Sequence, residues 1–361
     1  MPRAVFDMVR VQKSRYNVGV VTTRIYNNVA DSFCDEDISV LYLRNLSSKM
    51  AFNYQLYTPI PHTKLFSIVK KADIIHFHGH RNLLNDLIFY IARIFNKPYI
   101  ITTHGTLHSY ESKRLVKSIY DVITGNRFVR DAKYIVVHSE VERSKLTSLG
   151  ISPSKIRVIP NGIYFDDLNS SSDQDFFKKF GIGERERVIL FLGKITRRKG
   201  LEVALDAFRR IKDGSLKLIV AGEVIGELPE DVMRDERVKY IGHLELEDKI
   251  SAILSSVMLL YPSIYEAFGY VPFEALYLKR PCIIGDDFGT SEHLSKVVPE
   301  LVVSYGDSIE LSELMKRLLE DKEMREHVVE KGRVYVMKEF HIEKMIDKYD
   351  ELYRDIIGGL S

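Results

Sequence analysis

Short apolar runs rich in valine and isoleucine alternate along the chain with amphipathic segments of helical period. Apolar runs of this length without polar alternation are typical of parallel strands that helices cover on both faces. The predicted strands are 38–43, 73–78, 99–103, 134–138, 188–192, 216–221, 257–261, 282–285 and 301–304. The predicted helices include 82–95, 201–211, 246–254, 270–278 and 311–319. This alternation predicts an α/β fold of doubly wound parallel sheets.

A change of pattern near residue 160 indicates two domains. Pro160 and Asn161-Gly162 are turn signals, and a polar, serine-rich stretch follows them like a linker. We expect one Rossmann-like domain over 1–165 and a second over 166–340. The last segment, 341–358, has an apolar stripe of helical period, and we expect this helix to pack back on the first domain.

Composition limits the class of protein. The chain has 361 residues, of which 45% are hydrophobic and 28% charged, as in ordinary globular proteins of two domains. The two cysteines, Cys34 and Cys282, are too few for a disulfide framework or a cysteine-based zinc module. Charged residues interrupt the N-terminal segment, and the longest apolar stretch, 83–95, is too short to cross a bilayer. We therefore expect a cytoplasmic protein without a transmembrane helix.

The charge is unevenly divided between the two predicted domains. Residues 1–165 hold 23 Lys and Arg against 12 Asp and Glu, a net charge of +11, and the remainder carries −9. A basic module favours an anionic partner, such as lipid headgroups, nucleic acid or a phosphorylated acceptor. Ordinary solvated surfaces are the alternative.

A basic loop follows the predicted strand 188–192. Lys194, Arg197, Arg198 and Lys199 lie between a strand end and a predicted helix start. Cationic side chains and helix N–H groups at such a junction bind anions, and a diphosphate fits them. A solvated basic turn is the alternative.

Two glutamates follow the predicted strand 257–261. Glu266 lies in the loop, and Glu274 lies one turn into the helix that we expect to begin near Tyr270. Gly269 permits close approach of a ligand to the backbone. Glutamates at such a position can accept hydrogen bonds from sugar hydroxyls, whereas the alternative is a capping glutamate and a surface glutamate.

The segment 262–281 resembles the donor-site signature of retaining glycosyltransferases of family 4, which have the GT-B architecture. Five further motifs resemble that family in the same order: His76-Phe77-His78-Gly79, Thr103-His104-Gly105, His138-Ser139-Glu140, Val158-Ile159-Pro160-Asn161-Gly162 and residues 193–200. The resemblance covers nearly the whole chain. It implies two Rossmann-like domains that face a central cleft, with the acceptor bound by the first domain and a nucleotide-sugar donor by the second.

The resemblance also assigns roles to residues of the second domain. Glu274 would bind the ribose hydroxyls of the donor, and Glu266 would contact the transferred sugar. Lys194 and Lys199 would neutralise the pyrophosphate beside the strand end at Gly193. Backbone N–H groups of Phe268, Gly269 and Tyr270 would assist them, and Gly242, His243 and Leu244 would lie near the nucleotide base.

In the first domain, the resemblance implies that His104 lies over the donor sugar and that Gly19 belongs to a glycine-rich loop that approaches the phosphate. The predicted catalytic residues are therefore His104, Lys194, Lys199 and Glu266. Histidines cluster between 76 and 108, but no acidic residue joins them at ligand-like spacing, so we expect no metal and no cofactor.

The resemblance implies transfer of a hexose, with retention of configuration, from a nucleotide diphosphate sugar to a hydroxyl acceptor. We expect a lipid-linked or cell-envelope glycan as the acceptor, no nucleic acid, and peripheral contact with an anionic inner membrane face through Lys113, Arg114 and Lys117. Two alternatives remain. One is a sugar-nucleotide 2-epimerase on the same architecture, and the other is a non-catalytic nucleotide-sugar-binding subunit of a membrane transferase complex.

Overall fold

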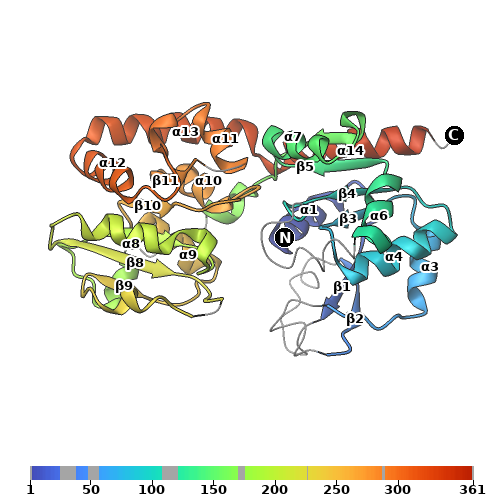
Figure 1. Cartoon of the computed structure of the whole chain (residues 1–361), viewed down its shortest axis with the longest axis horizontal. Helices are drawn as coiled ribbons and strands as arrows, with labels where there is room; N and C mark the ends of the chain where they lie inside the picture. The colour runs from blue at the N-terminus through green and yellow to red at the C-terminus, as the bar shows by residue number, and fades with distance from the viewer. Residues whose placement is uncertain are drawn as a thin grey trace. The chain divides into compact units, whose positions relative to one another are not determined.

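The chain forms two compact units in a computed structural model that describes residues 2–24, 38–47, 57–107, 121–169, 175–225, 227–286 and 289–359. Unit 1 comprises Met1–Gly162 and Ile342–Ser361, and unit 2 comprises Ile163–His341. The boundaries expected from the sequence lie within three residues of these limits. Figure 1 shows both units with their helices and strands.

Within its described residues, unit 1 contains a parallel strand pair and a four-stranded parallel sheet of order β3-β4-β5-β6. Its strands are β1 (Gly19–Arg24), β2 (Ser39–Arg44), β3 (Ile75–His78), β4 (Tyr99–Thr102), β5 (Tyr134–Val137) and β6 (Ile156–Val158). Its α-helices are α1 (Pro2–Gln12), α3 (Lys64–Lys71), α4 (Leu83–Ile94), α6 (Asn126–Asp131), α7 (Glu140–Ser148) and α14 (Ile342–Gly358). All four residues of β4 are buried, as its largely apolar sequence predicts, and they include the polar Thr102.

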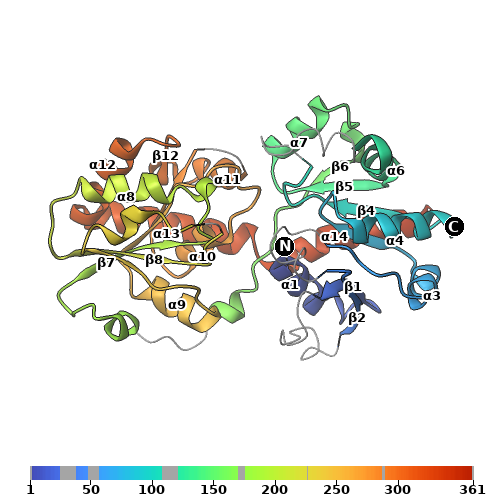
Figure 2. The same ribbon diagram turned by 60° about the horizontal axis from the view of Figure 1, so that its bottom comes forward.

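The C-terminal helix α14 is part of unit 1, where it packs against α1 (Figures 1 and 2). Tyr349 hydrogen bonds Thr102 at the end of β4, with 2.9 Å between the two hydroxyl oxygens. Arg15, just after α1, pairs with Asp347 and Asp350 at 2.7 Å. The helix brings more acidic than basic residues, so the net charge of unit 1 is +9 and that of unit 2 is −7.

Unit 2 contains, within its described residues, a six-stranded parallel sheet of order β12-β11-β10-β7-β8-β9. Its strands are β7 (Arg187–Leu192), β8 (Leu216–Ala221), β9 (Val238–Tyr240), β10 (Met258–Tyr261), β11 (Cys282–Gly285) and β12 (Val302–Val303). Its α-helices are α8 (Leu201–Arg209), α9 (Leu246–Leu254), α10 (Tyr270–Tyr277), α11 (Gly289–Ser295), α12 (Ser308–Glu320) and α13 (Lys322–Glu339).

The strand order reverses direction between β7 and β10. Because right-handed crossovers that run in opposite directions along a sheet place their helices on opposite faces, both faces are covered. Figure 2 shows α8 and α9 on opposite sides of β7 and β8. Ligands of such sheets bind at the carboxyl ends of the strands near this reversal.

All nine predicted strands are present, and their ends differ from the predicted ones by at most two residues. The prediction missed β1, β6 and β9. The last two have three residues each and lie at sheet edges, and Arg157 and Lys239 interrupt their apolar runs. In the part of the chain that the structure describes, no helix has both the length and the apolar character needed to cross a membrane.

Candidate functional site

Lysine and glutamate side chains meet at the carboxyl ends of the strands of unit 2. Lys194 follows β7 and Glu223 follows β8, and the Lys194 ammonium lies 3.3 Å from a Glu223 carboxylate oxygen. The Lys194 side chain is 61% exposed, so water screens this pair. The backbone next to it is fixed, because the N–H of Gly193 donates to the carbonyl of Ala221.

Lys199, in the same loop as Lys194, forms a more enclosed pair. It ends the 3₁₀ turn Arg197–Lys199, and its ammonium donates to Glu266 Oε1 and to the Tyr261 hydroxyl oxygen, each at 2.6 Å. The Lys199 and Glu266 side chains are only 17% and 19% exposed. Burial, and then the nearby Glu266 carboxylate, raise the pKa of Tyr261 well above its ordinary value, so Tyr261 is a neutral phenol.

Close backbone contacts join the two loops that carry Lys199 and Glu266. The N–H of Ile264 donates to the carbonyl of Arg198 at 2.9 Å. Gly200 has a φ of +72°, and a Cβ there would lie 2.1 Å from the Pro262 carbonyl oxygen. Only glycine therefore fits at this crossing, and the loop geometry positions Lys199 against Glu266.

Glu274 is buried in α10, with 1% of its side chain exposed. The ammonium of Lys249, from α9, lies 2.8 and 2.9 Å from its two carboxylate oxygens. Lys249 is itself only 16% exposed and covers the carboxylate. A buried carboxylate needs such a partner, because an isolated charge away from water is very unfavourable. The glutamate predicted to face ribose hydroxyls is thus held by a lysine.

One of the three predicted backbone donors has a partner inside unit 2. The N–H of Gly269 donates to Thr290 Oγ1 at 2.8 Å in a buried position, and the contact of this segment with a diphosphate stays a prediction. A Cβ at Gly269 would lie 2.9 Å from the Tyr261 hydroxyl, which explains the glycine. Phe268 is buried in the core of unit 2, and Tyr270 is the first residue of α10.

The residues predicted near the nucleotide base lie after the edge strand β9. The carbonyl of Gly242 accepts a hydrogen bond from the N–H of Gly222 at 2.7 Å. His243 is largely exposed, with its Nε2 atom 3.8 Å from Glu245 Oε1, and Leu244 is buried. Their contact with a base stays a prediction.

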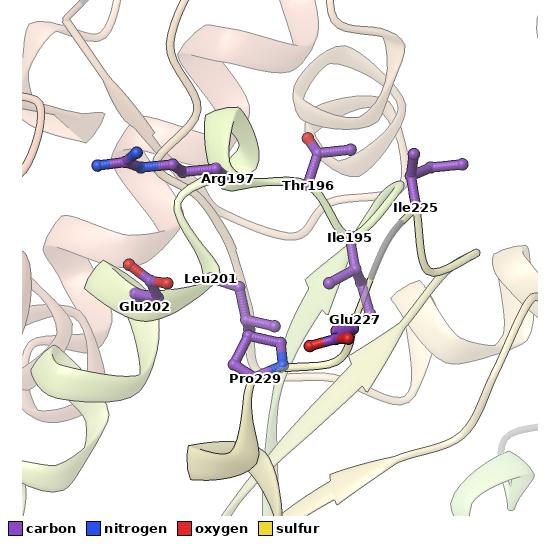
Figure 3. Close-up of a pocket in the computed structure, with 8 residues that line it drawn as sticks. All are labelled: Ile195, Thr196, Arg197, Leu201, Glu202, Ile225, Glu227 and Pro229. Atoms are coloured by element: carbon purple, nitrogen blue, oxygen red, sulfur yellow. The ribbon is translucent and has the colours of Figure 1, made fainter. Parts of the chain in front are cut away.

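A pocket adjoins the loop of Lys199 (Figure 3). Its lining residues are Ile195, Thr196, Arg197, Leu201, Glu202, Ile225, Glu227 and Pro229. Figure 3 shows the Arg197 side chain pointing away from Glu227. Because Glu202 and Glu227 place two carboxylates around this pocket, it does not suit a diphosphate, and we do not assign the donor to it.

The structure corrects the expectation for Gly19 in unit 1. Gly19 is not part of a loop: it is the first residue of β1 and pairs with Ser39 on β2. The nearest atom to a Cβ at this position would be the Ser39 carbonyl oxygen at 3.8 Å, so the backbone does not require glycine here.

His104 follows β4 with a φ of +46°, a left-handed conformation that residues other than glycine adopt rarely. Its Nε2 atom lies 3.0 Å from His78 Nδ1, and its Nδ1 atom lies 3.1 Å from His138 Nε2. Burial lowers the pKa of His78 to about 3 and holds the pKa of His104 well below its ordinary value. These imidazoles are neutral near pH 7.

The buried carboxylate of Glu142 supports the loop that carries His104. It accepts hydrogen bonds from the N–H of Gly105 at 3.2 Å and from the N–H of His138 at 3.0 Å. Ser139 caps α7 by accepting from the N–H of Glu142. Helix α7 therefore begins within the motif His138-Ser139-Glu140, and this start positions Glu142 against the backbone of His138.

The histidines of unit 1 hydrogen bond one another: His104 contacts both His78 and His138. Among the described residues, no group of three or more His, Cys, Asp or Glu side chains is placed to hold a metal ion. Asp286 accepts a hydrogen bond from the N–H of Tyr305, whereas Asp287, His108, Lys113, Arg114 and Lys117 lie outside the described residues.

Sequence reasoning missed several members of this site. Tyr261 ends a predicted strand, and that position is the signal that could have identified it. Thr290 and Glu223 also follow predicted strands. Lys249 lies in the middle of an amphipathic helix, and nothing in the sequence pattern connects it with Glu274.

Two α/β units, each with a parallel sheet, form the GT-B fold of glycosyltransferases. The crystal structure of HepE from Anabaena in complex with UDP and glucose has this fold. It superposes with a TM-score of 0.76 at 16% identity, covering 98% of this chain and 95% of that one.

The family models for "Glycosyltransferase Family 4" and "Glycosyl transferases group 1" match residues 1–167 and 172–335. The chain therefore belongs to glycosyltransferase family 4 and is a glycosyltransferase. It is 28% identical to an O-antigen chain mannosyltransferase C of Escherichia coli, covering 90% of this chain and 86% of that protein. It is 20% identical to the UDP-Gal:alpha-D-GlcNAc-diphosphoundecaprenol alpha-1,3-galactosyltransferase of Escherichia coli, with the same two coverages, 90% and 86%.

Proposed function

We propose that the protein transfers a hexose, with retention of configuration, from a nucleotide diphosphate sugar to a hydroxyl of a lipid-linked or cell-envelope glycan. The names of its relatives support the acceptor class, since they include a galactosyltransferase acting on a diphosphoundecaprenol-linked sugar and an O-antigen mannosyltransferase. The UDP-bound HepE structure supports a nucleotide donor.

The observation that carries this proposal is that unit 2 holds both the cluster of Lys199, Glu266 and Tyr261 and the Lys249–Glu274 pair. Glu274 is the proposed ribose ligand, and Glu266 is the proposed ligand of the transferred sugar. Without a donor, Glu266 forms an ion pair with Lys199, and Glu274 forms one with Lys249. A diphosphate would attract Lys199 away from Glu266, and Glu266 would then accept hydrogen bonds from sugar hydroxyls.

Lys199 and Lys194 have a second role in this reaction. As the sugar leaves, negative charge grows on the β-phosphate of the nucleotide. Cations that already lie at the site stabilise this charge more in the transition state than in the ground state. Lys199 is the better placed of the two, because it is only 17% exposed whereas Lys194 is 61% exposed.

The test is a panel of UDP, GDP and ADP sugars, first by thermal shift and then by turnover. NMR spectroscopy of the product gives its anomeric configuration. Slow hydrolysis of a donor without acceptor supports a transferase, a new sugar nucleotide supports an epimerase, and binding without hydrolysis supports a non-catalytic subunit. An inverted anomer would contradict retention.

We also propose that unit 1 contacts an anionic membrane surface. Its net charge is +9, and helix α3 exposes Phe66 and Ile68 between Lys64 and Lys70. Apolar side chains between lysines suit an anionic interface. Sedimentation with phosphatidylcholine vesicles, with and without phosphatidylglycerol, tests this: binding should require the anionic lipid and weaken as salt rises. Binding that ignores lipid charge would contradict it.

A further inference from the structure

Three histidines form a continuous hydrogen-bonded row across the sheet of unit 1. His78 ends β3, His104 follows β4 and His138 follows β5, and these strands are neighbours in the sheet. The nitrogen-to-nitrogen distances are 3.0 Å from His78 to His104 and 3.1 Å from His104 to His138. The row therefore lies along the carboxyl ends of parallel strands, where α/β sheets bind their ligands.

A backbone carbonyl fixes one end of this row. His138 Nδ1 lies 2.9 Å from the carbonyl oxygen of Ile159, which can only accept a hydrogen bond. Nδ1 of His138 therefore carries the proton, and Nε2 of the neutral ring is an acceptor.

The direction of every other hydrogen bond in the row follows from this end. His138 Nε2 accepts, so Nδ1 of His104 is the donor and Nε2 of His104 is an acceptor. Because His104 Nε2 accepts, the His78 Nδ1 atom that contacts it must be the donor and carries the proton. Nε2 of His78 is left with a lone pair at the far end of the row.

The row is neutral. Burial lowers the pKa of His78, His104 and His138. The carboxylate of Glu142 accepts from the backbone N–H groups of Gly105 and His138. A doubly protonated His104 would reverse the hydrogen bond to His78, and burial disfavours this charged form.

His78 Nε2 has no hydrogen-bond partner within the part of the chain that the structure describes, and the side chain is partly exposed. The adjacent ring of His76 lies 4.1 Å from the His78 ring, but its two nitrogens already bond Thr102 and Tyr353. The lone pair of His78 is therefore an acceptor that, among the described residues, remains available to a ligand at this edge of the sheet.

We infer that His78 Nε2 accepts a hydrogen bond from a substrate hydroxyl group, and that His138 is a positioning residue that sets the protonation of His104 and His78. The hydroxyl belongs either to the sugar of the donor or to the acceptor, and this part rests on the proposed function. The proton positions do not depend on the proposed function, because they rest on the hydrogen bonds of the row and on the burial that keeps the rings neutral.

Histidine-labelled protein tests the proton positions without any substrate. Long-range nitrogen–proton NMR correlations at pH 7.5 should show His78, His104 and His138 with the proton on Nδ1. A proton on Nε2 of His78 or His104, or a doubly protonated ring, would overturn the inference whatever the enzyme catalyses.

A matched pair of variants tests the role of His78. Asparagine places an amide at the Nδ1 position, so His78→Asn keeps the donor to His104 and loses the outer acceptor. Glutamine places its amide at the Nε2 position, so His78→Gln keeps an outer acceptor. We expect His78→Asn to raise a KM about 3- to 10-fold, the value of one hydrogen bond, and His78→Gln to stay closer to the parent protein.

Two assays with the donor that turns over in the panel identify the hydroxyl. A raised KM in donor hydrolysis without acceptor assigns it to the sugar, and a raised KM for the acceptor alone assigns it to the acceptor. Equal KM values for both variants and the parent protein would overturn the role of His78.

The role of His138 is tested in the same way. His138→Gln keeps an oxygen that can accept from His104 Nδ1, whereas His138→Asn keeps the contact with Ile159 and loses that acceptor. We expect His138→Asn to move the His104 proton in the NMR spectrum and to raise the same KM, and His138→Gln to rescue both. A parent-like spectrum of His138→Asn would overturn the positioning role.

Discussion

The two sheets present opposite chemistry at the carboxyl ends of their strands. Unit 2 presents charged pairs, Lys194–Glu223 and Lys199–Glu266, with Lys249–Glu274 between its helices. Unit 1 presents neutral imidazoles that bond one another. The difference shows that one backbone architecture can present two kinds of binding group: ammonium groups suit a diphosphate, whereas neutral hydrogen-bonding groups suit hydroxyls.

The strand ends of unit 2 and unit 1 also differ in the interactions that fix their side chains before a ligand binds. Each of these lysines of unit 2 has an internal carboxylate as counter-ion, so an arriving anion competes with that carboxylate. The imidazoles need no counter-ion, and their geometry is set by the Ile159 carbonyl. Variants that remove charge should therefore affect unit 2 strongly, and changes of pH should affect unit 1.

The largest expected effect is the loss of stability when the buried Lys249–Glu274 pair is broken. Glu274→Ala leaves the Lys249 ammonium without its partner, and the free energy of unfolding should fall by about 3–5 kcal/mol. Glu274→Ala/Lys249→Met removes both charges and should recover most of that loss. Chemical denaturation of the two variants gives the comparison.

Donor binding separates stability from function at the same pair. If Glu274 binds ribose, the double variant should bind the donor about 10- to 150-fold more weakly than the parent protein although its stability recovers. Calorimetric titration measures this. Parent-like affinity of the double variant would mean that Glu274 has only a structural role.

Lys199→Met should be next in size. Loss of one pre-positioned charge at a developing anion costs about 2.7–4 kcal/mol, or roughly 10²- to 10³-fold in turnover. Arg198→Met is the matched control, because Arg198 lies in the same turn and is exposed. The control should keep most of its turnover. Similar turnover of the two variants would mean that this loop is an ordinary solvated surface.

The sequence predicted nine of the described strands because apolar runs report burial directly, but it missed β1 and the short edge strands β6 and β9. It also placed Lys199, Glu266 and His104 at strand ends, since loop residues after a strand share one edge of a parallel sheet. The pairing of Lys249 with Glu274 was not predictable, because the two helices meet only through tertiary packing. Gly19 was misplaced because a single glycine does not distinguish the start of a strand from a loop.

Acid should destabilise unit 1 before unit 2. Unfolded histidines bind protons near pH 6.5, whereas folded His78 does so near pH 3, so protons favour the unfolded state and stability falls below pH 6.5. Each buried histidine of this kind lowers the free energy of unfolding at pH 5.5 by about 1.4 kcal/mol. The lowered pKa values in unit 2 belong to carboxylates such as Asp213 and Asp235, whose contribution persists until the pH falls towards 4.

Hydrogen-exchange mass spectrometry at pH 7.5 and pH 5.5, corrected for intrinsic exchange rates, compares the two units in one sample. Peptides of unit 1 should lose protection at pH 5.5, and peptides of unit 2 should keep it. His76→Gln should reduce the acid sensitivity, because burial lowers the pKa of His76 as well and glutamine takes up no proton. An equal loss of protection in both units would contradict the prediction that acid destabilises unit 1 first.

The smallest effect should come from the exposed pair of unit 2. The Lys194 and Glu223 side chains are 61% and 48% exposed, and pairs of this kind contribute about 0–1 kcal/mol. Lys194→Met should therefore leave the free energy of unfolding nearly unchanged and raise the donor KM about 2- to 5-fold. Glu223→Gln removes the competitor of the diphosphate for Lys194 and should lower the same KM slightly. Both effects should fade as salt rises, because salt screens exposed charges, whereas the effect of Lys199→Met should persist. Salt-independent KM changes in the Lys194 and Glu223 variants would show that this pair is as enclosed in the donor complex as Lys199–Glu266 is in the free protein.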